Sequence, residues 1–132
     1  MTFGQKALIF CSAMGAFTST GHADPCTGVL PSAGTRFIGV VRYVGDGDSL
    51  CIGPEDRPDR WIEIRLGDFS APELHEPGGE RSKRLLAAAT MGHTLICRAG
   101  RRSYDRIVAT CMIGGRPLGN ELRRLGGVEG GR

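Results

Sequence analysis

Five short segments of β-type sequence, interrupted once by a helical segment, constrain the fold of this chain more than any other feature. The β-type segments cover 37–44, 49–52, 61–66, 93–98 and 106–113, and turn-forming Gly, Pro or Asp residues separate them. Residues 80–90 form the one strong helical segment, which Gly92 closes, and a shorter helix is expected at 118–125. This order predicts an α+β fold: a five-stranded Greek-key β-barrel of the OB type with helices. We expect the first helix across one end of the barrel and the second against its side.

The third β-type segment has the clearest alternation. Its apolar positions point one way and its other positions the opposite way, which predicts a half-buried strand. The inward set is Ile62, Ile64 and Leu66, and the outward set is Trp61, Glu63 and Arg65.

The first 23 residues have the composition of a cleavable signal peptide. Lys6 precedes an apolar stretch at 7–17, and small residues stand three and one positions before Asp24. The stretch is too short to span a bilayer, and a buried N-terminal helix is disfavoured because Pro25 follows at once. We therefore expect a secreted or periplasmic protein with no membrane segment after cleavage. Its parts would be the signal peptide at 1–23, a lead-in at 24–36, the folded domain at 37–126 and a flexible Gly-rich tail at 127–132.

Removal of the leader would leave Cys26, Cys51, Cys97 and Cys111, an even number in a compartment where disulfides form. Four cysteines allow three pairings. There is no CxxC spacing and the histidines are scattered, so disulfides are favoured over a zinc site. Cys97 and Cys111 lie on segments that should be neighbouring strands, which predicts a disulfide between them. Cys26–Cys51 then follows by elimination.

Charge gives a weaker indication of the partner. The 17 bases of the chain fall to 16 without Lys6, against 14 acids, and all of those 16 except Lys83 are arginines. Arginine binds phosphate with a planar, two-pronged fork. The small net charge does not by itself diagnose a nucleic-acid partner. Nothing in the sequence indicates an obligate protein partner, so we expect a monomer.

Several charged residues could carry chemistry, but each is ambiguous when taken singly. Asp46 and Asp48 flank Gly47 in a pattern that can bind a calcium-sized cation or can form an ordinary hairpin turn. Arg65, Glu73 and Arg106 could each be a solvated surface charge.

The order and spacing of these residues are more specific. The runs VRYVGDGDSL at 41–50, IRLGDFSAPEL at 64–74 and YDRIVA at 104–109 resemble the three signature segments of the staphylococcal-nuclease (thermonuclease) family. The resemblance covers about residues 37–126. It implies the five-stranded OB barrel of that family and a metal-dependent nuclease activity.

The resemblance also implies a cation site. Asp48 matches a calcium-ligand aspartate, Asp46 an acidic residue that supports the site without binding the cation, and Ala71 a ligand through its backbone carbonyl. The family's second carboxylate ligand is replaced here by Ser70, a weaker and neutral ligand, so calcium affinity should fall or another cation should bind. Asp68 lies two residues earlier and, if the strand continues to residue 70, on the same face, so one hypothesis is that its carboxylate reaches the cation site.

On the substrate side, Arg65 and Arg106 match the two arginines that bind the scissile phosphate. Glu73 matches the glutamate taken as general base toward the attacking water, and Tyr104 matches a tyrosine at the nucleotide pocket. No aromatic residue follows Tyr104, so stacking on a base should be weaker than in the family.

The expected function is therefore a secreted phosphodiesterase that uses a divalent cation, calcium by resemblance, and cuts DNA or RNA with little sequence preference, because phosphate contacts carry no base information. One alternative is a catalytically weakened OB-fold module that binds single-stranded nucleic acid or an extracellular partner. Another is a small disulfide-stapled structural protein. The nuclease hypothesis predicts that Asp48, Arg65, Glu73 and Arg106 converge on one open pocket.

Overall fold

The computed structural model describes residues 24–130, so the expected signal peptide lies outside the described residues. An N-terminal hairpin of β1 (Arg36–Asp46) and β2 (Ser49–Ile52) is followed by a short 3-10 helix, η1 (Pro58–Arg60), and by β3 (Ile62–Leu66). Helix α1 (Gly79–Thr90) leads into the second hairpin, β4 (Thr94–Ser103) and β5 (Arg106–Ile113). The described chain ends with β6 (Arg116–Pro117) and α2 (Leu118–Arg124).

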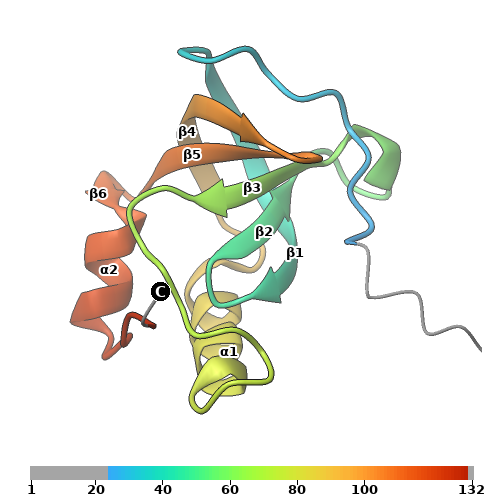
Figure 1. The fold of residues 1–132 in the computed structure, drawn as a ribbon. Helices are drawn as coiled ribbons and strands as arrows, with labels where there is room; N and C mark the ends of the chain where they lie inside the picture. The colour runs from blue at the N-terminus through green and yellow to red at the C-terminus, as the bar shows by residue number, and fades with distance from the viewer. Residues whose placement is uncertain (1–23, 131–132) are drawn as a thin grey trace, which may run out of the picture.

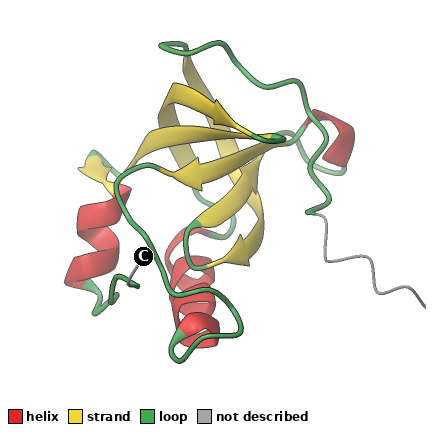
Figure 2. Ribbon diagram, viewed as in Figure 1, coloured by secondary structure: helices red, strands yellow, loops and turns green. Residues whose placement is uncertain are grey.

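The strands form one sheet in the order β3-β2-β1-β4-β5-β6, with antiparallel neighbours throughout. In addition, β3 pairs with β5 in parallel, so each strand from β1 to β5 pairs with at least two others. Helix α1 contacts β1, whereas α2 contacts β5, β6 and α1 (Figure 1). Figure 2 shows the strands gathered together with both helices at their periphery. The described residues therefore form a small α+β domain with a six-stranded sheet, consistent with an OB-like fold.

The predicted strands and helices are confirmed with three differences. The short 3-10 helix η1 was not predicted. The two-residue strand β6 was not predicted, because two residues are too few to show a period. Strand β4 was predicted to end at residue 98, but it continues to Ser103. The residues after 98, which were expected to turn the chain over 100–105, therefore form strand up to Ser103, and the turn is confined to Tyr104 and Asp105. Two residues of β4, Gly100 and Arg101, stand opposite the single residue Val108 of β5, and this β-bulge keeps the strands paired beyond it.

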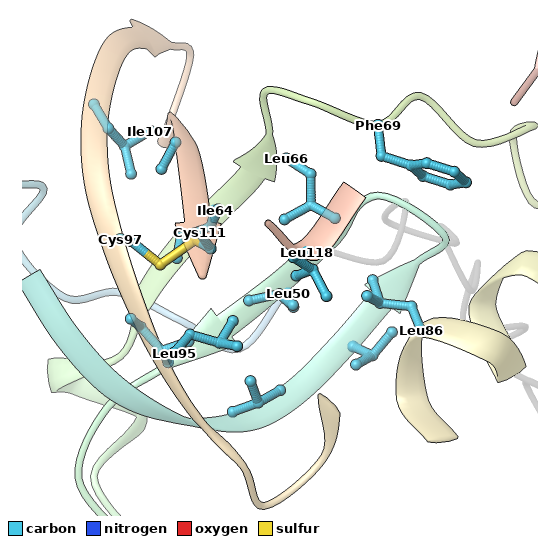
Figure 3. Packing of buried hydrophobic residues seen from close by; sticks show 14 of the residues in the cluster. Leu50, Ile64, Leu66, Phe69, Leu86, Leu95, Cys97, Ile107, Cys111 and Leu118 are labelled. Carbon is cyan, nitrogen blue, oxygen red and sulfur yellow. A yellow bond between two sulfur atoms is a disulfide. The ribbon is translucent and has the colours of Figure 1, made fainter. Parts of the chain in front are cut away.

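The hydrophobic core is built from the inward positions of the strands and from both helices. Figure 3 shows the core side chains in contact across the sheet and the disulfide among them. The fully buried members include Leu50, Ile64, Leu66, Leu86, Leu95, Ile107, Leu118 and Leu122. Because burying each such side chain contributes roughly 1.5–3 kcal/mol, this cluster fixes the strands that carry the candidate site.

Strand β3 is not half-buried as predicted, because both of its faces are covered. Ile64 is fully buried on the inner face, yet Glu63 and Arg65 on the outer face are only 7% and 9% exposed. The lead-in covers one part of the outer face, where Gly28 N donates to Trp61 O at 2.8 Å. The loop after β3 covers Arg65. The alternation gave the direction of each side chain but not the segments that pack over them.

Both predicted disulfides are present. Cys97 and Cys111 stand directly opposite each other on β4 and β5 with their Cα atoms 4.0 Å apart. Cys26 is joined to the buried Cys51 and ties the lead-in to β2. Disulfides are typical of oxidising compartments. Within residues 24–130, no helix has the length and apolar character needed to cross a membrane.

Candidate active site

The turn between β1 and β2 holds two aspartates in fixed positions. Asp46 Oδ1 accepts hydrogen bonds from Asp48 N at 3.0 Å and from Ser49 Oγ at 2.8 Å. Between the aspartates, Gly47 packs so closely on α1 that a Cβ atom there would lie 2.5 Å from Ser82 Cβ. The two aspartates thus form a turn closed by side-chain hydrogen bonds, and glycine between them is the only residue small enough to fit against the helix.

Asp48 is buried where this turn meets the loop after β3. Its Oδ2 accepts a hydrogen bond from Ala71 N at 2.9 Å and lies 3.2 Å from Arg65 Nη2. Burial, together with contact with the Asp46 carboxylate, raises the pKa of Asp48 to about 6, although Ala71 N and Arg65 act in the opposite direction. Two acidic groups therefore share a site in which a second full negative charge is unfavourable.

Arg65 is held on the outer face of β3 by contacts on three sides. It stands between Ser49 of β2 and Val108 of β5 in the sheet register. Besides its ion pair with Asp48, its Nη1 donates to Phe69 O at 2.9 Å, and its Nη2 donates to Ser70 Oγ at 3.0 Å. The loop that covers Arg65 therefore also fixes the direction of its guanidinium group.

Arg106 is a diagonal neighbour of Arg65. It begins β5 two residues before Val108, so both arginines project from the same face of adjacent strands. Arg65, Ser70 and Arg106 line one cavity of about 280 Å³, together with Arg101 and Ser103 of β4. The structure thus brings together three of the predicted site residues, and Asp48 contacts the first of them.

A second cavity, of about 480 Å³, lies on the other side of Arg106 and is mainly acidic. Its charged and acidic lining residues are Asp24, Asp46, Glu63, Glu80, Lys83, Asp105 and Arg106. Burial, a hydrogen bond with Asp24 and the charges of Asp24 and Asp105 raise the pKa of Glu63 from 4.5 to about 8, although Arg106 lowers it. Arg106 therefore separates a basic cavity from an acidic one.

Two predicted residues lie apart from these cavities. Glu73 is in the turn before α1, where its N–H donates to Glu76 Oε1 at 3.1 Å, and it lines neither cavity. Tyr104 is 92% exposed at the turn between β4 and β5, with a φ of 58°. The hydrogen bonds of the described residues place the carboxylate of Asp68 against Gly119 N of α2, at 3.0 Å, rather than beside Asp48.

The sequence prediction missed Glu63, Arg101 and Ser103 as site residues. Glu63 has the same parity as Arg65 on β3, so the alternation could have identified it. Arg101 could not be identified in this way, because the bulge at Gly100 and Arg101 changes the parity of β4.

The donor set favours a cation that keeps much of its water. Among residues 24–130, no three His, Cys, Asp or Glu side chains group as metal ligands would. Asp46 and Asp48 are in contact, however, and after burial the Asp46 carboxylate is the main cause of the raised pKa of Asp48. A cation beside two carboxylates relieves the repulsion between them, so these residues fit a divalent ion with few protein ligands better than a site of six to eight protein oxygens.

Comparison of the chain with models of known protein families finds no match, and comparison with curated proteins finds none either.

Proposed function

We propose that this protein is an exported phosphodiesterase that hydrolyses DNA or RNA with little sequence preference and depends on a divalent cation. The observation that carries the proposal is the cavity in which Arg65 and Arg106 project from adjacent strands beside Asp48. The fold supports it, because the pairing of β3 with both β2 and β5 completes a ring of five paired strands, as in an OB barrel of the staphylococcal-nuclease type.

Two guanidinium groups suit the chemistry of phosphodiester cleavage. Attack on phosphorus increases the negative charge on the phosphate oxygens, so fixed positive groups stabilise the transition state more than the ground state. Arg65 is held by Asp48, Phe69 O and Ser70, so it needs little rearrangement as this charge develops. Arg106 is partly exposed at the cavity, so it would contact the phosphate from a second side.

Asp48 would hold the cation, with Asp46 beside it and the Ala71 carbonyl as a further ligand. Calcium is the ion that the family resemblance implies, although the small donor set also suits a cation that retains water. A divalent cation bound there would supply positive charge next to the phosphate and acidify water. Ser70 is neutral and so adds no negative charge to the cation site, and its Oγ accepts a hydrogen bond from Arg65.

Glu73 is the proposed general base. It belongs to the same loop as Ser70 and Ala71, one residue before the exposed Leu74, which lines the acidic cavity. As general base, its carboxylate would have to approach water near the phosphate when substrate binds. Apo hydrogen bonds in active sites often tighten only in the complex.

The second candidate is an OB-type module that binds single-stranded nucleic acid without cutting it. The ion pair between Arg65 and Asp48 favours it, because Asp48 already has a cationic partner in place of a metal ion. A binding module would use the arginines but would have no need of Glu73.

The test is incubation of purified mature protein with labelled single-stranded DNA and RNA, with calcium, magnesium or manganese, and with a chelator. We expect cleavage with cation and none with chelator. Glu73→Gln should reduce turnover by about 10²–10⁴-fold while substrate binding holds, and Glu76→Gln in the same turn is the matched control. Ser70→Asp adds an anionic oxygen and should lower the cation concentration for half-maximal activity.

The absence of cation-dependent cleavage by both the wild type and Ser70→Asp would favour the binding module over the enzyme. Cleavage that is as fast in Glu73→Gln as in Glu76→Gln would show instead that Glu73 is not the general base.

A further inference from the structure

Strand β4 carries exposed arginines whose position depends on the β-bulge. Ala99 of β4 is buried and pairs with Ala109, so its neighbour Arg98 points to the outer face. Regular alternation would then turn Arg101 toward the core. The bulge, with Gly100 and Arg101 opposite Val108, instead returns Arg101 to the outer face, where it lines the cavity of Arg65 and Arg106.

A third cavity lies beside the Arg65–Arg106 cavity, over β5 and β4. It has a volume of about 340 Å³ and is bounded by Arg98, Gly100 and Thr110. The two cavities share Gly67 and Val108, so they adjoin on the outer face of the sheet, and we call the two together the groove. Gly100 leaves room in the groove for the strand to pair closely, because a Cβ atom there would lie 2.9 Å from Val108 O.

The groove carries positive charge along its length. Arg65 and Arg106 lie at one end, Arg101 at the edge of the shared part, and Arg98 at the other end. Arg98 Nη1 donates to Gly34 O at 3.0 Å, which holds this exposed side chain in place. Arg36 of β1 stands directly opposite Arg98 and is also exposed. In the other direction from Arg106 the acidic cavity repels phosphate, so electrostatics favours only one path for a polyanion.

We infer that Arg101 and Arg98 are additional phosphate-binding residues, and that a single strand of nucleic acid runs from the Arg65–Arg106 cavity over Gly67 and Val108 to Arg98. Arg98 and Arg101 stand three positions apart on one strand, so their Cα atoms are at most roughly 10 Å apart, and their long side chains would reach different phosphates of the strand. The ligand is then a strand of several nucleotides rather than a mononucleotide. This inference rests on the proposed function for the position of the first phosphate.

The test is the salt dependence of binding to a fluorescent ten-nucleotide single-stranded DNA, measured by anisotropy in the presence of chelator so that no cleavage occurs. Each phosphate contact with a single strand contributes about 0.7 to the slope of log affinity against log salt concentration. Arg98→Gln and Arg101→Gln should each lower the slope by about that amount and weaken binding, and Arg98→Lys should restore it. Glutamine at 98 can still donate to Gly34 O, so the loop stays anchored.

The matched control is Arg84→Gln, which removes an exposed arginine of α1 and should leave the slope unchanged. A dinucleotide with one phosphodiester should bind the wild type and Arg98→Gln equally, because Arg98 lies outside the Arg65–Arg106 cavity. The inference is overturned if the wild type does not bind the ten-nucleotide strand, or if Arg98→Gln and Arg101→Gln match Arg84→Gln in slope. If Arg98→Gln and Arg101→Gln lower the slope but the wild type never cleaves nucleic acid, the path of the strand is supported and the nuclease activity is contradicted. If the wild type cleaves and the two variants leave the slope unchanged, the activity is supported and the path is contradicted.

Discussion

At the scale of single residues, Glu63 and Arg65 stand two positions apart on one face of β3 and meet opposite surroundings. Arg65 finds the Asp48 carboxylate at 3.2 Å and the Ser70 hydroxyl. Glu63 instead faces the carboxylates of Asp24 and Asp105 in the acidic cavity. Similar burial therefore holds a charged arginine but favours a neutral glutamic acid, because the partner groups differ.

Glu63→Gln should remove a pH-dependent loss of stability. The folded protein keeps the Glu63 proton up to about pH 8, whereas the usual pKa is 4.5, so between these values the folded state binds more protons than the unfolded chain. The free energy of unfolding must then fall as pH rises through this window. Glutamine cannot lose that proton, so the variant should gain stability relative to the wild type at pH 8 but not at pH 4.5. Thermal melts across this range measure the difference, with exposed Glu55→Gln as control; parallel curves for Glu63→Gln and wild type would contradict the expectation.

At the scale of elements, two local irregularities place the side chains of the candidate site. The turn between β1 and β2 packs Gly47 against Ala71 and Ser82, which brings Asp48 to the loop after β3 and to α1. The bulge in β4 returns Arg101 to the outer face. The turn needs a glycine, because a side chain at position 47 would push it away from α1. The bulge needs one extra residue in β4, because a regular ladder would turn Arg101 toward the core.

Gly47→Ala should separate the turn from α1. The added methyl would lie 2.5 Å from Ser82 Cβ and would also overlap Ala71 Cβ, so the turn must move away. Overpacking of this kind typically costs about 1–3 kcal/mol. Urea unfolding measures the loss, and cation-dependent activity should fall further than stability because Asp48 moves with the turn. Gly67→Ala is the control for stability alone, since the nearest atoms to its Cβ lie 3.4 Å away; equal losses of stability in the two variants would show that close packing at Gly47 is not the cause.

At the scale of the whole molecule, few covalent and polar ties hold the segments that cover the sheet. One disulfide joins the paired strands β4 and β5, and the other attaches the lead-in to β2. At the other end of the chain, Gly130 N donates to Ser70 O at 2.8 Å, and Arg123 pairs with Glu129 at 2.9 Å. The described part of the expected tail thus contacts the loop that carries Ser70.

Replacing Cys97 and Cys111 together by alanine should lower the free energy of unfolding by about 3 kcal/mol, the value for a closed loop of about 15 residues in the chain-entropy model. The sequence separation is 14, compared with 25 for Cys26 and Cys51, so the second double variant should lose slightly more. Denaturant unfolding of both variants gives the two values. The pH dependence of stability should also differ between the two double variants. Only loss of the Cys26–Cys51 bond should release the lead-in with Asp24 from Glu63, and so change how the free energy of unfolding varies between pH 4.5 and 8. An identical pH profile in both variants would contradict this role of the lead-in.

The sequence by itself determined the order of β1 to β5 and of both α-helices, the inward side chains of β3 and the Cys97–Cys111 pair, because periodicity, turn residues and strand adjacency are local or nearly local properties. The Cys26–Cys51 pair followed by elimination. The sequence also selected Arg65 and Arg106, which the structure places in one cavity. Only the tertiary structure decided that Glu63 and Arg65 are buried, that Asp68 faces α2, that Glu73 lies outside both cavities and that Arg101 joins the groove. These outcomes depend on which distant segment packs over each strand and on one extra residue in β4, and neither leaves a period in the sequence.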